Sequence, residues 1–201
     1  MGLEQDLSEF RESGMPITGI KYTGETCCGL VLSKAEFEDV TFENCRFLGC
    51  SFESGYFQRV SFLNCSIQKS SFLNAYFKQS LLDRCQGDEG DFRRCFWKET
   101  VISGGSYCYA NFSAAKWEGG KISGAFLNHS FFQEEKWKKM QFENTDLTDV
   151  DFFKTPLRGM DFSNCKIERI RVSDTYSELK GMKIGVEQAL DIALLLGVKM
   201  G

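Results

Sequence analysis

Few side chains in this sequence have the type and spacing that catalysis or metal binding requires. The single histidine, His129, has no second histidine with which to form an acid–base pair, and no adjacent motif makes it a metal ligand. The sequence contains no nucleophile elbow and no glycine-rich phosphate loop that opens a helix. We therefore expect no enzyme activity, no metal, no cofactor and no small-molecule substrate.

The nine cysteines are the other residues with reactive side chains, and their spacing decides their meaning. In a short secreted protein they would suggest disulfides, but this chain is longer and we find no export signal at its start. Residues stacked in register point the same way and lack disulfide geometry, so we expect all nine thiols to be free. Six share one position of a repeat, where a thiol acts as a compact apolar side chain; these are Cys45, Cys50, Cys65, Cys85, Cys95 and Cys165.

Composition limits the possible partners. The 201 residues are 42% hydrophobic, which is enough for one sizeable core and requires no second domain. The net charge of −4, from 28 acidic and 24 basic residues, disfavours binding to nucleic acid or to an anionic membrane surface. No segment is uniformly apolar over the roughly 18 residues that a membrane-spanning helix needs. We expect a cytoplasmic protein.

A five-residue repeat organises most of the chain. Of the 29 positions reached from Leu32 to Val172 in steps of five, 28 carry an apolar side chain, and Gly87 is the exception. Neither the period of a helix, about 3.6 residues, nor that of a strand, about two, produces this pattern. A second, mostly small residue precedes each large one by two positions, and the remaining three positions are mostly polar. Each unit is therefore expected to form one short side of a coil.

Similar residues recur every twenty positions, and this spacing sets the number of sides. Twenty residues per coil and five per side predict a four-sided coil. With coils about 4.8 Å apart, roughly eight coils would make a rod about 38 Å long over residues 17–175. A solid core of this kind leaves no interior pocket. The recurring residues are Trp97, Trp117 and Trp137 in one set and Cys45, Cys65 and Cys85 in another.

Both ends of such a stack need cover, because an open end exposes core side chains and strand edges. Residues 1–16 are compatible with a short amphipathic cap and equally with a frayed terminus. In the C-terminal segment 176–201, Val186–Leu196 predicts a helix that ends at Gly197. This helix is more apolar than a cap requires, so we expect it to pair with a second copy; a monomeric cap is the alternative. The expected contact residues are Ala189, Leu190, Ala193, Leu194 and Leu196.

Two inward positions break the repeat. Gly87 takes the place of a large residue, so we expect a bulge or lost core volume there, with a functional role and a tolerated defect both left open. Glu135 occupies a small inward position, where an ionised carboxylate is costly. Local distortion is the favoured interpretation, and pairing with Lys136 or another neighbour is the alternative.

The outward positions contain an unusual number of aromatic residues. Tyr56, Tyr76 and Phe96 repeat every twenty residues and are expected to form a stripe on one side. Phe126, Phe131 and Phe153 are also expected to point outward. Exposed aromatic surface often marks a partner site, and simple stacking along the rod explains the stripe equally well.

Sorting the outward charges by column separates a less basic side from a more basic one. The first side is a second candidate partner surface, with carboxylates at Glu43, Asp83, Glu143 and Asp161 against the cations Arg84 and Lys121. The second gathers Arg59, Lys78, Lys98, Lys116, Lys136, Lys138, Lys139 and Arg158.

The repeat resembles that of the pentapeptide-repeat family over about four fifths of the chain. Within the family, the local sequence pattern is most similar to that of the quinolone-, albicidin- and microcin-resistance proteins that act on DNA gyrase. The residues that carry this resemblance are Tyr22-Thr-Gly-Glu-Thr26, the run Phe42-Glu-Asn-Cys-Arg-Phe47 and the short helix after the coils. The resemblance implies a right-handed quadrilateral β-helix that imitates duplex DNA and pairs end to end as a dimer. The projecting loops of some resistance members are absent, because no insertion interrupts the coils here.

Charge alone does not make this chain a DNA mimic. Duplex DNA carries about one negative charge per 1.7 Å, so a 38 Å rod would need roughly 22 negative charges to match it. The chain has a net charge of −4. We therefore expect shape and a less basic side to act in the DNA groove of a target. Two hypotheses remain: a protein that binds DNA gyrase or topoisomerase IV and protects it from quinolone-like poisons, and a scaffold that binds a different protein.

Overall fold

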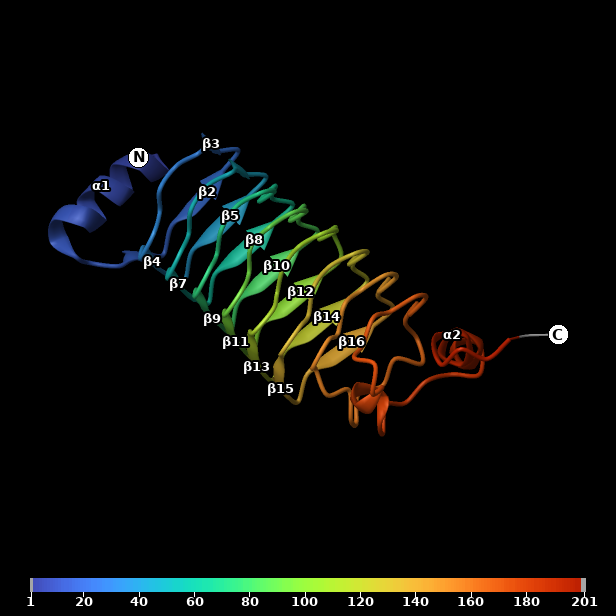
Figure 1. The fold of residues 1–201 in the computed structure, drawn as a ribbon. Coiled ribbons are helices and arrows are strands. Elements are labelled where there is room, and N and C mark those ends of the chain that lie inside the picture. Colours follow the sequence, from blue (N-terminus) through green and yellow to red (C-terminus); the bar gives the residue numbers. More distant parts are fainter. Residues whose placement is uncertain (1, 200–201) are drawn as a thin grey trace.

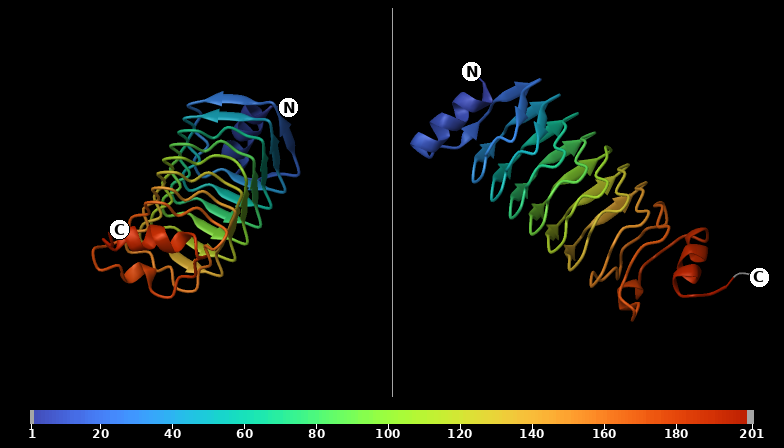
Figure 2. Two further views of the ribbon diagram at one scale, coloured as in Figure 1. Left: turned by 90° about the vertical axis from the view of Figure 1, so that its right-hand side faces the viewer. Right: turned by 45° about the horizontal axis from the view of Figure 1, so that its top comes forward.

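The five-residue repeat folds into a rod of stacked coils, with the N-terminus at one end and the C-terminus at the other (Figure 1). The computed structural model describes residues 2–199. Seen obliquely along the rod, the successive coils share a four-sided outline (Figure 2). The predicted all-β, right-handed quadrilateral β-helix is thereby confirmed, and a short helix follows it at the C-terminal end.

The first two sides of the coil are parallel sheets of seven strands each. We call them side 1 and side 2; the chain passes from one to the other at a corner in every coil. Side 1 consists of β1 (Ile17–Thr18), β4 (Glu36–Glu38), β7 (Tyr56–Gln58), β9 (Tyr76–Lys78), β11 (Phe96–Lys98), β13 (Lys116–Glu118) and β15 (Lys136–Lys138). Side 2 consists of β2 (Lys21–Thr23), β5 (Thr41–Glu43), β8 (Ser61–Leu63), β10 (Leu81–Asp83), β12 (Val101–Ser103), β14 (Lys121–Ser123) and β16 (Gln141–Glu143).

The other two sides are less regular. Side 3 begins with the paired strands β3 (Thr26–Cys28) and β6 (Arg46–Leu48) and continues as isolated parallel bridges to Lys166. Side 4 consists of isolated bridges from Val31 to Arg171. Sides 1 and 2 therefore offer the longest regular surfaces of the rod.

Each strand pairs with the strand twenty residues further along the chain, as the recurring residues predicted. Phe37 pairs with Phe57, and Trp97 with Trp117, so the inward aromatic rings stack along the rod. The Trp97 ring centroid lies 4.2 Å from that of Phe77 and 4.7 Å from that of Trp117. Most of the large inward residues are almost completely buried, and stacked aromatic pairs of this kind stabilise a core beyond the area they bury.

The corners of the coil require a left-handed backbone. In most units, the residue two positions after the large inward side chain has a positive φ, for example 54° at Asn44 and 60° at Ala114. Asparagine and glycine adopt this conformation at low cost, whereas a side chain such as alanine is strained there. The polar positions of the repeat thus supply the turns as well as the solvated surface.

Gly87 does not produce the bulge that we expected. Its N–H donates to the carbonyl of Ser106 at 2.7 Å, so the ladder is unbroken. A Cβ atom at Gly87 would lie 2.5 Å from the ring of Tyr107, which is the inward residue of the next coil in the same column. The ring fills the space that a larger side chain would take. The expectation of lost core volume is wrong because a neighbouring side chain supplies that volume.

Both ends of the rod are covered. Helix α1 (Leu3–Ser13) buries Leu3 and Leu7 against the first coil, and the Tyr22 hydroxyl donates to Asp6 at 2.6 Å. At the other end, a 3-10 turn (Ser177–Leu179) leads to α2 (Gln188–Leu195), slightly shorter than the helix expected over Val186–Leu196. The Gln188 amide donates to carbonyls of the last coil, including that of Cys165 at 3.0 Å. Within the described residues, no helix is long and apolar enough to cross a membrane.

Candidate partner-binding surface

The aromatic stripe of side 1 is a stack of rings that cover one another. The Tyr56 and Tyr76 centroids are 5.2 Å apart with nearly parallel planes, and Phe96 follows edge-on at 5.1 Å. Lys116 Nζ lies 4.5 Å from the Phe96 ring centroid. All three rings are half-buried. Stacking along the rod is therefore present, and a role in partner binding stays a prediction.

The carboxylates predicted on one side do lie together on side 2. Glu43, Asp83 and Glu143 belong to one continuous column of paired strands. Asp161 lies near Glu143, where both line a surface depression at the C-terminal end. Sides 1 and 2 are consecutive in every coil, so the aromatic stripe and this carboxylate column occupy adjacent sides of the rod.

Most of these carboxylates have cationic partners. Glu43 lies 2.8 Å from Lys21 Nζ, Asp83 lies 2.9 Å from Arg84, and Glu143 lies 2.7 Å from Lys121 Nζ. The hydroxyl of Ser163 donates to Asp161 at 2.6 Å, and hydrogen bonds from the Ser163 side chain and backbone lower the pKa of Asp161. Side 2 thus carries carboxylates along its length but little net charge.

A more exposed group of aromatic residues lies at the corner between sides 3 and 4. We call it the aromatic corner; it consists of Tyr109, Phe126, His129 and Phe131. Tyr109 is 56% exposed and Phe126 is 57% exposed, so they are more accessible than the stripe on side 1. The His129 ring stacks on Tyr109 at 4.8 Å, and its Nδ1 lies 3.7 Å from Asp149. Phe126 was expected to point outward and does. We had not considered Tyr109, although its position twenty residues before His129 was the available signal.

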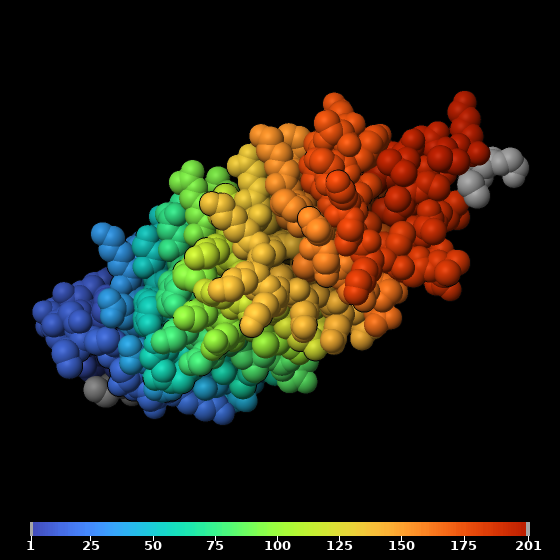
Figure 3. Space-filling view, turned by 90° about the horizontal axis from the view of Figure 1, so that it is seen from below, coloured from blue at the N-terminus to red at the C-terminus, as the bar shows by residue number. Residues whose placement is uncertain are grey.

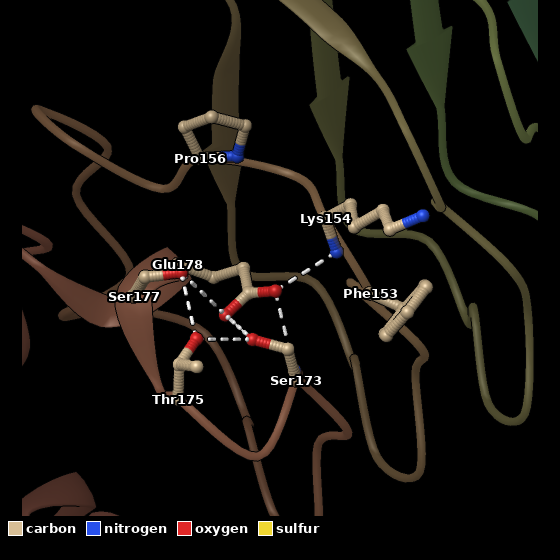
Figure 4. Close-up of a pocket in the computed structure, with 7 residues that line it drawn as sticks. All are labelled: Phe153, Lys154, Pro156, Ser173, Thr175, Ser177 and Glu178. Atoms are coloured by element: carbon tan, nitrogen blue, oxygen red, sulfur yellow. Dashed lines mark hydrogen bonds between the residues drawn. The ribbon is translucent and has the colours of Figure 1, made fainter.

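Phe153 lines a depression at the C-terminal end, together with a cluster of polar residues around Glu178 (Figure 4). Glu178 accepts hydrogen bonds there from the backbone N–H of Lys154 at 2.9 Å and from the Ser173 hydroxyl at 2.8 Å. Burial alone would raise the pKa of Glu178, but these hydrogen bonds outweigh it and the pKa is lowered. The polar groups satisfy one another, so this cluster holds the chain in place after the last coil.

Glu135 is buried, as its inward position requires, but its partner is not Lys136. One carboxyl oxygen accepts from the Ala115 N–H at 3.2 Å, and the other accepts from the Trp137 indole Nε1 at 3.2 Å. Burial raises the pKa of this carboxyl well above its usual value. Trp137 is less buried than Trp97 and Trp117, but the ladder beside Glu135 is unbroken, since the Lys136 N–H still donates to the Ala115 carbonyl at 3.1 Å. Neighbours other than Lys136 therefore pair with the carboxyl, which is the alternative to the distortion that we favoured.

Most of the cysteines are packing residues in this structure. The six at the small inward position are buried, Cys27 is buried as well, Cys108 is half-buried and Cys28 is exposed. The Cys65 thiol donates to the carbonyl of Phe42 at 3.3 Å, and Cys85 repeats this contact one coil later with Phe62 at 3.4 Å. Burial raises the pKa of the Cys95 thiol well above its usual value, which suppresses thiolate reactivity. Residues 2–199 contain no cluster of three or more side chains with the chemistry and placement of a metal site.

The helix expected to mediate dimerisation leaves much apolar surface uncovered. Ile192 and Leu195 pack against the core, whereas Leu190, Leu194 and Leu196 are 46%, 53% and 49% exposed. Ala189 is exposed and Ala193 is half-buried. The space-filling view shows this segment at the end of a continuous rod whose visible face has no deep cleft (Figure 3).

These observations define a class of protein: a solid β-solenoid built from five-residue units. A family model described as a pentapeptide repeat region matches residues 35–112. The five-residue unit of this part of the chain is thus the pentapeptide repeat.

Comparison with solved structures supports the same fold. Full-length QnrB1, described as a plasmid-mediated fluoroquinolone resistance protein, matches with a TM-score of 0.52 at 17% identity, covering 89% of this chain and 100% of that chain. A trypsin-treated variant of QnrB1 matches with a TM-score of 0.50 at 18% identity, covering 93% of this chain and 98% of that chain. At these identities the likeness shows the fold. No curated protein matches the chain significantly.

Proposed function

We propose that this protein binds a type II topoisomerase, DNA gyrase or topoisomerase IV, in the cytoplasm and protects it from quinolone-like poisons. The observation that carries the proposal is the long, uninterrupted surface of side 2, with carboxylates at Glu43, Asp83 and Glu143, which are three of the six rungs in that stretch of one column. A straight rod with such a side can enter a groove shaped for duplex DNA. The fold shared with QnrB1, whose description names fluoroquinolone resistance, supports this choice of target.

The ion pairs of side 2 bear on how binding would work. A basic groove on the target can compete with Lys21 and Lys121 for their carboxylates, because exposed ion pairs contribute little stability and exchange readily. Binding by this route replaces an internal cation with one from the target. Shape complementarity then contributes more than net charge, in agreement with the chain's small net charge of −4.

The test is a supercoiling assay with purified gyrase, in the presence and absence of a fluoroquinolone. We expect the protein to restore supercoiling in the presence of the drug. No effect at tens of micromolar, about the weak end of specific protein complexes, would contradict the proposal.

A charge-reversal series connects the assay to side 2. Glu43→Lys together with Glu143→Lys should weaken protection at least about tenfold, because two attractive contacts become repulsive. Glu53→Lys, at an exposed position on side 4, is the matched control and should leave protection unchanged. Equal loss in both variants would show that side 2 is not the contact surface.

We propose further that the protein forms a homodimer through α2. Ala189, Leu190, Ala193, Leu194 and Leu196 together present apolar surface that the last coil does not cover. Leu190→Glu with Leu194→Glu should shift the sedimenting species from a dimer to one of 22.9 kDa. Val31→Glu, an apolar-to-acidic change at the opposite end of the rod, is the control. A wild-type protein that sediments at 22.9 kDa at micromolar concentration would remove this dimer.

The second candidate function is a scaffold for a protein other than a topoisomerase, and the aromatic corner favours it. Exposed Tyr109 and Phe126 form the kind of surface that protein partners bury at interfaces. Tyr109→Ser with Phe126→Ser separates the two functions. Unchanged gyrase protection in this variant would leave the corner free for another partner, and loss of protection would assign it to the topoisomerase.

A further inference from the structure

Side 1 carries opposite charges at its two ends. Near the N-terminal end, its outward residues and the following corner are Glu36, Glu38 and Asp39, and near the C-terminal end the same three positions are Lys136, Lys138 and Lys139. The two sets are five coils, or 100 residues, apart. Between them lies the stripe of Tyr56, Tyr76 and Phe96.

Several of these charges have no partner within the molecule. Asp39 is held by Arg59, and Lys138 by Glu118. In the part of the chain from residue 2 to residue 199, Glu36, Glu38, Lys136 and Lys139 have no oppositely charged group within 4.0 Å. Lys116 and Lys136 are moreover direct neighbours in the ladder, and like charges opposite one another destabilise a sheet. An external partner with negative charge would relieve that repulsion.

We propose that side 1 pairs with side 1 of a second copy, with the two rods side by side and pointing in opposite directions. Turning one copy over about an axis parallel to its strands reverses the order of the coils and keeps each column opposite itself. The first outward column reads Glu36, Tyr56, Tyr76, Phe96, Lys116 and Lys136 along the rod. Reversal then places Glu36 opposite Lys136, Tyr56 opposite Lys116, and Tyr76 opposite Phe96.

Every pair in this column is favourable. The outermost pairs are ion pairs, the next are cation–π contacts between a tyrosine and a lysine, and the central pairs are aromatic. In the neighbouring column, Glu38 faces Lys138 and Gln58 faces Glu118, while Lys78 facing Lys98 is the one unfavourable match. The corner adds Asp39 opposite Lys139.

Charge also excludes the other symmetric arrangement. If the rods pointed in the same direction, each coil would face its own counterpart, so Glu36 would meet Glu38 and Lys136 would meet Lys138. Like charges would then face one another at both ends. The antiparallel pair is the symmetric arrangement in which acidic ends meet basic ends.

The contact is narrow, so the association is expected to be weak and sensitive to salt. Three-residue strands of about 10 Å and six rungs about 4.8 Å apart give roughly 300 Å² for each copy, well under the usual 800 Å² or so of a stable interface. Exposed charges are largely screened at high salt. We expect dimers at about 0.1–1 mM protein in low salt and monomers near 1 M salt.

The experiment uses the full chain carrying Leu190→Glu and Leu194→Glu, so that pairing through α2 does not contribute. Two variants are made in this background: an acid-reversed one (Glu36→Lys, Glu38→Lys) and a base-reversed one (Lys136→Glu, Lys138→Glu). Each alone should associate at least about tenfold more weakly than the parent, since attraction becomes repulsion at both ends. An equimolar mixture should form a mixed dimer, because an all-basic side 1 then faces an all-acidic one.

Sedimentation gives the mass, and small-angle scattering distinguishes a side-by-side pair, with nearly the length of a monomer, from an end-to-end pair. Circular dichroism shows that the variants fold. The proposal fails if the parent stays monomeric in low salt, or if the mixture associates no better than its components. It also fails if the lysine end binds heparin while acid reversal leaves self-association unchanged, since the basic end would then serve an external polyanion. None of these outcomes depends on gyrase binding or on α2.

Discussion

Glu135 is a carboxyl group in a column where the neighbouring coils place small side chains, namely Ala115 and Thr155. Its two hydrogen bonds, from the Ala115 N–H and the Trp137 indole, explain how a buried carboxyl is tolerated. The same burial that raises its pKa makes its contribution to stability depend on pH. Glu135 thus places a titratable carboxyl among side chains that are mostly apolar.

The raised pKa of Glu135 makes the stability of the protein depend on pH in a definite direction. The pKa of Glu135 is higher in the folded state than in the unfolded chain, so its stabilising contribution is complete below about pH 4 and falls as the pH rises toward the folded value. Glu135→Gln should remove this decline, so the free energy of unfolding, measured with urea from pH 4 to pH 8, should vary less with pH. Glu134→Gln, at an exposed neighbour, is the control. Parallel curves for wild type and Glu135→Gln would contradict the assignment.

The Tyr107 ring occupies the space beside Gly87, so a larger residue at position 87 should clash with it. Gly87→Ala places a Cβ atom within 2.5 Å of the Tyr107 ring and should cost about 1–3 kcal/mol through overpacking. Replacing Tyr107 with leucine in the same molecule should recover part of that loss, since contacting residues are not additive. Denaturant unfolding of the two single variants and the double variant measures the coupling. Additive losses would mean that the two sites are independent.

At the scale of the element, the corners matter as much as the strands. Each three-residue strand is too short to be stable by itself and depends on the corner that turns the chain onto the next side. Most corners hold asparagine, glycine or a charged residue with positive φ, and Ala114 is an exception with φ of 60°. The methyl side chain of Ala114 cannot form a hydrogen bond that would offset the steric cost of a positive φ, so this corner is strained.

Ala114→Gly therefore should stabilise the protein by about 0.5–1 kcal/mol, because glycine adopts a positive φ without steric cost. The matched control is Ala115→Gly, at a buried position next to it, which should destabilise through lost packing. Thermal unfolding monitored by circular dichroism compares the two. A loss of stability in both variants would show that the corner is not strained.

At the scale of the whole molecule, the sequence was sufficient for the fold, because inward and outward positions follow from a fixed period. The contacts that surface side chains make with one another were harder to predict. The half-burial of Tyr56 depends on the ring of Tyr76 one coil away, and the neutralisation of Glu43 depends on Lys21, which is 22 residues earlier. Such contacts arise between coils and depend on the rotamers of long side chains. The inward position of Glu135 was foreseen, while its indole partner was not, since Trp137 had to turn toward it.

The twenty-residue coil has one more consequence, for changes in chain length. Removing residues 57–76 joins two coils without altering the orientation of anything beyond the junction, so the shortened chain should fold with all four sides intact and be about 4.8 Å shorter. Removing residues 57–61 instead rotates everything downstream by a quarter turn and brings unlike columns together. Solubility and circular dichroism of the two deletions should differ sharply. Insertion or deletion of whole coils can therefore change the length of such a rod while each surface column stays aligned. Length and surface pattern can then vary separately in evolution.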